Sequence, residues 1–124
     1  MLWWLIGALA LGLGGWSAVS AHRVLHPRPK PVLPYTPAIP THTHTLRDQR
    51  QQPFDIHALC AASPRGVLIL CHGYFANHQQ VMPVADGLAR RGYTTVVFDF
   101  PAHGQRRGRC TFGKEETEIG RAHV

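Results

Sequence analysis

Two histidine–glycine pairs, His72-Gly73 and His103-Gly104, are the residues of this 124-residue chain best placed to take part in chemistry. Each pair follows a run rich in apolar and β-branched residues, Val67–Cys71 before the first and Thr94–Phe100 before the second. The continuous apolar run Val67–Cys71 predicts a strand covered on both faces. A glycine directly after a strand lets backbone N–H groups approach a ligand closely. A histidine at such a place either braces the loop or carries a proton. The two loops are therefore candidates for one shared site.

The segment between the loops predicts the elements that position them. Its apolar residues recur at three- and four-residue steps, which predicts a helix from about His78 to Arg91. Asn77 is a suitable cap, Pro83 is expected to kink or shorten the start, and Gly92 ends the helix. Strand, helix and strand joined by short turns are typical of a right-handed parallel crossover. Ligands collect at the carboxyl ends of such strands, where both loops lie.

The segments on either side of this unit give weaker signals. We expect a hairpin from Thr43–Arg47 and Phe54–Ala61, and the first turn of a further helix at Gly113–Glu118. His42 and His44 lie two residues apart and could share one strand face as metal ligands. No third ligand stands nearby, so surface histidines are favoured, and the sequence indicates neither a metal nor a cofactor.

The N-terminal segment predicts a membrane anchor. Leu2 to Ala21 carries no charge over 20 residues, and a helix of that length is about 30 Å long, the thickness of a hydrocarbon core. The rival interpretation is a signal peptide cleaved after Ala21. No Lys or Arg precedes the apolar stretch, whereas Arg23, Arg28 and Lys30 follow it, and this favours the uncleaved anchor. The positive-inside rule then predicts a single-pass membrane protein with its main domain in the cytoplasm.

These features divide the chain into four parts: an anchor at 1–22, a proline-rich linker at 23–41, a domain at 42–118 and a tail at 119–124. Six prolines between Pro27 and Pro40 predict an extended stand-off spacer, which is favoured over an SH3-binding motif. The tail reads IGRAHV, one reading frame of a common sequencing adapter. We therefore expect the tail to be an artefact and the gene to continue beyond Glu118.

Charge and cysteine content exclude several classes. The formal net charge is +6, but the basic residues cluster beside the anchor and around Arg106–Arg109, so no nucleic-acid module is indicated. Cys60, Cys71 and Cys110 show no C-x-x-C spacing, which indicates free thiols rather than a disulfide framework or a zinc site. Cys71 is expected to be a buried small hydrophobic residue and not a nucleophile.

Two motifs carry a resemblance to a known family. The sequence GVLILCHGYFAN at 66–77 resembles the strand-to-helix oxyanion loop of α/β-hydrolases, in the branch of serine-aminopeptidase-like and monoacylglycerol-lipase-like proteins. FDFPAHGQRRGR at 98–109 is similar to the next strand and turn of that branch, and TFGKEE at 111–116 resembles the start of its next helix. The resemblance covers 63–118. It implies an α/β fold, the N-terminal part of an α/β-hydrolase with a mostly parallel sheet and crossover helices, here preceded by a transmembrane helix.

The resemblance also implies roles for the two loops. His72 and Gly73 would shape the oxyanion loop, with His72 as a brace rather than a proton carrier. The backbone N–H of Tyr74 would be one of two donors to the developing oxyanion, a kind of donor worth about 3 to 4 kcal/mol of barrier.

The second loop would shape the site. Asp99, His103 and Gly104 match turn positions of the family and are expected to organise the site rather than act in the reaction. Pro101-Ala102 stands where an Arg-Gly type of pair is usual. Ala102 would be strained if that position needs a positive φ, and Pro101 makes a cis bond possible.

No Gly-x-Ser-x-Gly elbow occurs in the chain, and Ser63, the only serine of the predicted domain, precedes the first strand of the motif. The resemblance places the nucleophile, acid and catalytic histidine later, so no catalytic residue is expected here. The intact protein is expected to be a membrane-anchored serine hydrolase acting on a small-molecule or lipid-like ester, thioester or amide. The alternatives are an α/β-hydrolase with an Asp nucleophile and a non-catalytic membrane-tethered interaction module. The chain alone is expected to be inactive and poorly stable.

Overall fold

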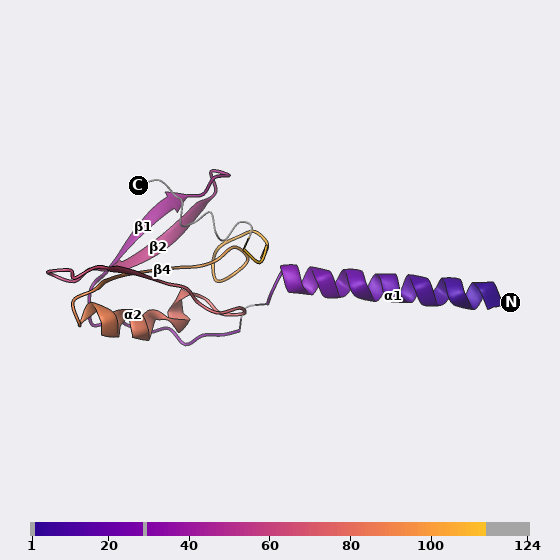
Figure 1. Cartoon of the computed structure of the whole chain (residues 1–124), viewed down its shortest axis with the longest axis horizontal. Helices are drawn as coiled ribbons and strands as arrows, with labels where there is room; N and C mark the ends of the chain where they lie inside the picture. The colour runs from indigo at the N-terminus through magenta and orange to yellow at the C-terminus, as the bar shows by residue number, and fades with distance from the viewer. Residues whose placement is uncertain (1, 29, 114–124) are drawn as a thin grey trace.

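The computed structural model of the chain describes residues 2–28 and 30–113. A long N-terminal helix projects from a small sheet domain, and a second helix lies against one face of the sheet (Figure 1). The predicted helix at Gly113–Glu118 and the tail at 119–124 fall almost wholly outside the described residues. The elements in chain order are α1 (Leu2–Leu25), β1 (Thr41–Arg47), β2 (Pro53–Leu59), β3 (Val67–Leu70), a 3₁₀ turn (His78–Gln80), α2 (Met82–Ala89) and β4 (Thr94–Phe98).

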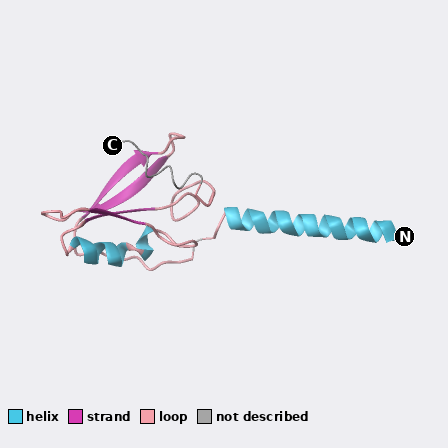
Figure 2. Cartoon of the chain, in the orientation of Figure 1, coloured by secondary structure: helices cyan, strands magenta, loops and turns pink. Residues whose placement is uncertain are grey.

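The four strands form one sheet in the order β1-β2-β4-β3 (Figure 2). β3 and β4 are parallel, with Val67 opposite Thr94, which confirms the predicted parallel pair. β1 and β2 form the predicted hairpin, and β2 pairs antiparallel with β4. Over the described residues the sheet is therefore mixed, not mostly parallel as expected, because the hairpin strand β2 lies directly beside β4.

The predicted helix from His78 to Arg91 is shorter than expected. A 3₁₀ turn spans His78–Gln80, and α2 begins only at Met82. Pro83 explains the late start, because a proline has no N–H to continue a hydrogen-bond ladder and is tolerated only in the first turn. Asn77 caps the 3₁₀ turn, not α2, because its side-chain oxygen accepts a hydrogen bond from the Gln79 N–H at 3.0 Å.

The core lies between the sheet and α2. Its buried members are Leu59, Met82, Ala85, Ala89 and Val97. β3 contributes little, because it is the edge strand of the described sheet and has one face uncovered. Val67 is 64% exposed and Ile69 61%, so the prediction of a strand covered on both faces is wrong for the described chain. Cys71 is likewise exposed, contrary to its predicted burial, because it follows this edge strand.

The proline-rich segment is not a stand-off spacer. It lies against α2, where the fully buried Asp86 binds it. The Asp86 carboxylate accepts hydrogen bonds from the Tyr35 hydroxyl at 3.0 Å and from the N–H groups of Ala38 and Ile39 at 2.9 and 3.0 Å. These bonds, that of Ile39 first, hold the pKa of Asp86 below its ordinary value although burial opposes the shift. The prolines thus keep an extended strap in place for these contacts.

The helix α1 is long and apolar enough to cross a membrane between Trp3 and Leu25. Its C-terminal end contacts the domain at three places. The Tyr74 hydroxyl donates to the Val24 carbonyl, the Cys110 N–H donates to the Leu25 carbonyl at 2.9 Å, and, just beyond the helix, the Lys30 N–H donates to the Phe75 carbonyl at 2.8 Å. Two of these contacts satisfy carbonyls that a helix end leaves without intrahelical partners.

Candidate active site

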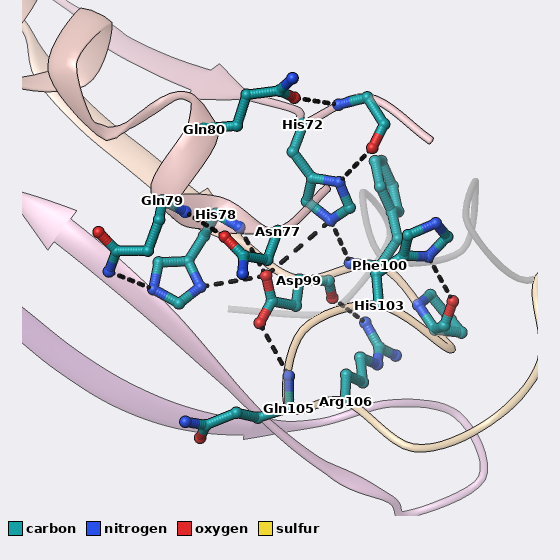
Figure 3. A network of polar contacts seen from close by, with 12 residues as sticks. His72, Asn77, His78, Gln79, Gln80, Asp99, Phe100, His103, Gln105 and Arg106 are labelled. Atoms are coloured by element: carbon teal, nitrogen blue, oxygen red, sulfur yellow. Dashed lines mark hydrogen bonds and ion pairs between the residues drawn. The ribbon is translucent and has the colours of Figure 1, made fainter. Parts of the chain in front are cut away.

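The loops that follow β3 and β4 lie side by side, and His72 joins them (Figure 3). Its Nδ1 is 2.8 Å from the Gly73 carbonyl oxygen, and its Nε2 is 3.0 Å from the Phe100 backbone nitrogen. A carbonyl only accepts and an N–H only donates, so Nδ1 carries the proton and Nε2 is the acceptor. Burial, the main cause, lowers the pKa of His72 and keeps this neutral form. His72 therefore acts as a brace, because both ring nitrogens are engaged by the backbone and neither is free to exchange a proton with a substrate.

The loop after His72 presents unpaired donors. The Gly73 N–H donates to the Gln80 side-chain oxygen at 2.8 Å, and the Ala76 N–H donates to the Gly73 carbonyl at 3.1 Å, which closes a tight turn. Between them, the backbone N–H groups of Tyr74 and Phe75 have no acceptor among the described residues. Phe75 has a φ of +66°, a strained conformation for a bulky residue. Such strain persists only where the surrounding contacts impose it, and it is concentrated at functional sites.

Asp99 organises the second loop. One carboxylate oxygen accepts from the backbone N–H of His78 at 2.7 Å and from its ring Nδ1 at 3.0 Å, and the other accepts from the Gln105 N–H at 3.3 Å (Figure 3). Burial alone would raise the pKa of Asp99, but the hydrogen bonds from His78 outweigh it and hold the pKa below its ordinary value. The 3.9 Å separation from the Nε2 of His72 is not an ion pair, because that imidazole is neutral. Asp99 is thus an ionised structural anchor.

Two residues of this turn have positive φ angles. Gly104 has φ +55°, and a Cβ added there would lie 2.0 Å from an Asp99 carboxylate oxygen, so only glycine fits. Ala102 has φ +65°, the conformation in which the sequence analysis expected it to be strained. The bond before Pro101 is trans, so the possible cis bond is not adopted.

His103 is buried beneath the first loop. Its Nδ1 donates to the Pro101 carbonyl at 2.9 Å, while its Nε2 has no hydrogen-bond partner among the described residues. Its ring lies 5.1 Å from that of His72 and 5.6 Å from that of Tyr74. The structure therefore places the six predicted site residues in two adjoining loops: His72, Gly73 and Tyr74 in the first, and Asp99, His103 and Gly104 in the second. Among the described residues, the buried Nε2 of His103 has no hydrogen-bond partner.

Sequence reasoning missed His78 and His57. His78 was assigned to the start of a helix, yet it holds Asp99 with both its backbone and its ring. The His57 ring, from β2, lies 4.3 Å from the His78 ring, and burial lowers the pKa of His57. Nothing in the sequence links these two positions, because their contact depends on how β2 pairs with β4.

The two loops can stabilise negative charge, but His72 and Cys71 are not arranged as a base and a nucleophile. His72 has both ring nitrogens engaged, and partial desolvation raises the pKa of the Cys71 thiol although the residue is exposed, which keeps it in the less reactive thiol form. His42 and His44 are exposed on β1, which is the edge strand opposite β3 in the described sheet. The chemical capacity of the site therefore lies in the free N–H groups of the first loop.

The comparisons with known proteins identify the fold. The family model described as "alpha/beta hydrolase fold" matches residues 66–112. An esterase of Pyrococcus furiosus is 26% identical with a TM-score of 0.61, covering 76% of this chain and 39% of the esterase. An α/β serine hydrolase without a lid from Xanthomonas campestris is 25% identical with a TM-score of 0.53, covering 73% of this chain and 44% of that one. No curated protein matches the chain.

A third structure resembles the chain in fold alone. It is a brefeldin A esterase, a bacterial homologue of human hormone-sensitive lipase, which is 18% identical with a TM-score of 0.53. The match covers 84% of this chain and 31% of the esterase. The chain thus spans about a third to two fifths of the length of these structures.

Proposed function

We propose that this chain, which has part of an α/β-hydrolase fold, is the oxyanion-loop portion of a membrane-anchored serine hydrolase. The enzyme would cleave a small-molecule or lipid-like ester, thioester or amide through an acyl-enzyme. Esterases and a serine hydrolase among the similar structures support this reaction class. The proposal needs no metal or cofactor.

The backbone N–H of Tyr74 is the observation that carries the proposal. It lies in the loop after the carboxyl end of β3, beside Gly73, and no described residue accepts its hydrogen bond. When a nucleophile attacks a carbonyl, the oxygen gains negative charge, and a fixed N–H near it lowers the barrier. His72 and Gly73 hold this N–H in place through the bonds to Phe100 and Gln80. Tyr74 is therefore the proposed oxyanion donor, with Asp99, His103 and Gly104 supporting the loop.

The nucleophile, acid and catalytic histidine are proposed to lie in sequence that follows residue 118 of the intact protein. This agrees with the engagement of both His72 ring nitrogens, which leaves this histidine unable to act as the general base. An Asp at the elbow would indicate the alternative enzyme class, and a residue unable to act as a nucleophile would indicate a non-catalytic module.

The test is to remove one hydrogen-bond donor from the full-length protein. Replacing Tyr74 by its α-hydroxy acid analogue converts the backbone N–H to an ester oxygen and keeps the side chain. We expect labelling by a serine-directed fluorophosphonate to slow by about 10² to 10³-fold. Protein made by the same incorporation method with tyrosine itself at position 74 is the matched control, because it keeps both the N–H and the hydroxyl bond to Val24, and it should label at the normal rate. Equal labelling of the ester analogue and the control would exclude the proposed donor.

The membrane part of the proposal rests on α1 and the basic residues after it. The helix would anchor the protein with its domain in the cytoplasm. Protease added to intact cells should leave the domain uncut, and it should cut the domain after permeabilisation. Digestion in intact cells would place the domain outside, and release of the protein by alkaline carbonate would exclude the anchor.

A further inference from the structure

An open cleft of about 1050 Å³ lies between the C-terminal end of α1 and the candidate oxyanion loop. One wall comes from Ala18, Val19 and His22 of α1, and the facing wall comes from the rings of Tyr74, Phe75 and Phe112. We propose that this cleft binds the acyl chain of a long-chain lipid ester that enters from the bilayer. The proposal rests on the proposed function and makes the anchor a wall of the substrate site.

Two direct contacts fix the helix against the loop and so define the cleft. The hydroxyl of Tyr74 binds the Val24 carbonyl, and the N–H of Cys110 binds the Leu25 carbonyl. The end of α1 is therefore tied to both loops that build the candidate active site. A cleft held from both sides in this way is a preformed site.

The position of the cleft along the helix points to the bilayer as the source of its ligand. The 24 residues of α1 extend about 36 Å, whereas a hydrocarbon core is about 30 Å thick. Roughly the last turn therefore emerges from the hydrocarbon, and Ala18 and Val19 lie just inside it. The cleft would then begin in the acyl region and end at the site loop.

The side chains of the cleft match the two ends of a lipid. Its facing wall is aromatic, and the Phe112 ring is 65% exposed, which costs free energy in water and suits an apolar chain. The cleft is also lined by Arg23 and Arg28, at and beyond the C-terminal end of α1, which suit the anionic headgroups found at a membrane surface. Aromatic and basic side chains together are the composition expected at a lipid–water boundary.

One lipid can occupy the cleft and reach the proposed donor at the same time. The ring of Tyr74 lines the cleft, while its backbone N–H is the proposed oxyanion donor. An ester carbonyl at the N–H therefore has its acyl chain beside the cleft, with no additional pocket required. This continuity favours an acyl chain over an apolar helix of a partner protein.

The test uses the full-length protein in phospholipid nanodiscs with a palmitoyl ester that carries a diazirine on its acyl chain. After irradiation, we expect adducts on Tyr74, Phe75 or Phe112 as well as on Ala18 or Val19. Ala18→Trp should fill the cleft and reduce adducts on the loop at least tenfold, and Phe112→Ala should weaken them. Ala10→Trp is the matched control, because it makes the same change on α1 outside the cleft, and it should leave the adducts unchanged.

Competition with unlabelled esters measures how much of the chain is buried. Each buried methylene should raise affinity about fourfold, so a twelve-carbon ester should compete about two orders of magnitude better than an eight-carbon ester. Adducts confined to residues 3–17, or equal loop adducts in Ala18→Trp and Ala10→Trp, would overturn the proposal. Cross-linking needs no hydrolysis, so it tests the cleft independently of the reaction. A failure of fluorophosphonate labelling would overturn the serine-hydrolase assignment but not the proposed lipid cleft.

Discussion

Replacing Gly104 by alanine should disorganise the second loop through a direct collision with Asp99. The added Cβ would lie 2.0 Å from one carboxylate oxygen and 2.4 Å from the carboxyl carbon. Ordinary contact begins near 3.4 Å, so the carboxylate must move by about 3.4 − 2.0 = 1.4 Å. Its hydrogen bond to the Gln105 N–H is already 3.3 Å long and would be lost.

The cost has two parts. Alanine at a φ of +55° costs about 1 to 2 kcal/mol, and losing one hydrogen bond to a charged acceptor costs about 1.5 to 3 kcal/mol. The sum is about 3 to 5 kcal/mol, which corresponds to a loss of about 10² to 10⁴ in amide protection at a loop that opens locally. The total is a large fraction of the stability of an ordinary domain.

Hydrogen exchange measured by mass spectrometry is the suitable assay. All three tryptophans, Trp3, Trp4 and Trp16, lie in α1, so tryptophan fluorescence does not report on this loop. The amides of His78 and Gln105 both bind the Asp99 carboxylate and report on it directly. If Gly104→Ala leaves the exchange of both amides within threefold of the parent, the collision argument is wrong.

Three further substitutions or conditions test other parts of the fold. Gly87→Ala in α2 should stabilise the domain by about 0.5 to 1 kcal/mol in urea denaturation, because nothing lies within 4 Å of the new Cβ and alanine favours a helix; a destabilised variant would contradict this. Asp86→Asn should speed exchange of the Ala38 and Ile39 amides, and unchanged rates would show that the strap does not depend on the carboxylate charge. Because burial lowers the pKa of His72 below its unfolded value, its contribution to stability is complete above about pH 6.5 and is lost as pH falls through the folded pKa. Urea midpoints from pH 7.5 to 5 should therefore decrease, and they should decrease less in His72→Asn.

The spacing of apolar residues along the sequence predicted the strands and the helix of the domain well where that spacing is regular. The β3 and β4 runs and the apolar face of α2 were recognised because burial on one side imposes a spacing on the sequence. The start of α2 was predicted too early, although Pro83 was expected to kink or shorten it. The cause is that the capping side chain of Asn77 belongs to a separate 3₁₀ turn that precedes α2. Where a 3₁₀ turn runs into an α-helix, the boundary depends on backbone hydrogen bonds that no single residue type specifies.

Contacts between distant segments could not be predicted from the sequence. The proline-rich strap was expected to be free, yet Asp86 binds it across 47 and 48 residues of chain. No pattern in the sequence singles out Asp86. A carboxylate that is fully buried needs partners, and only the structure shows that the N–H groups of an extended, proline-rich segment provide them.

At Tyr74, the candidate site combines a local sequence motif with a contact between distant segments of the chain. Its position after His72 and Gly73 was readable from the sequence because a strand-to-loop motif has a fixed order. Its second role was not readable, because the hydroxyl binds Val24, 50 residues earlier in the chain. A tyrosine has a polar end on a rigid ring, so one residue can offer a backbone donor to the site and a side-chain donor to the anchor. A displacement of α1 relative to the domain must therefore either break the bond to Val24 or move the loop that holds the proposed oxyanion donor. Helix α1 and the candidate site are thus mechanically coupled through Tyr74, in addition to the bond from the Cys110 N–H to the Leu25 carbonyl.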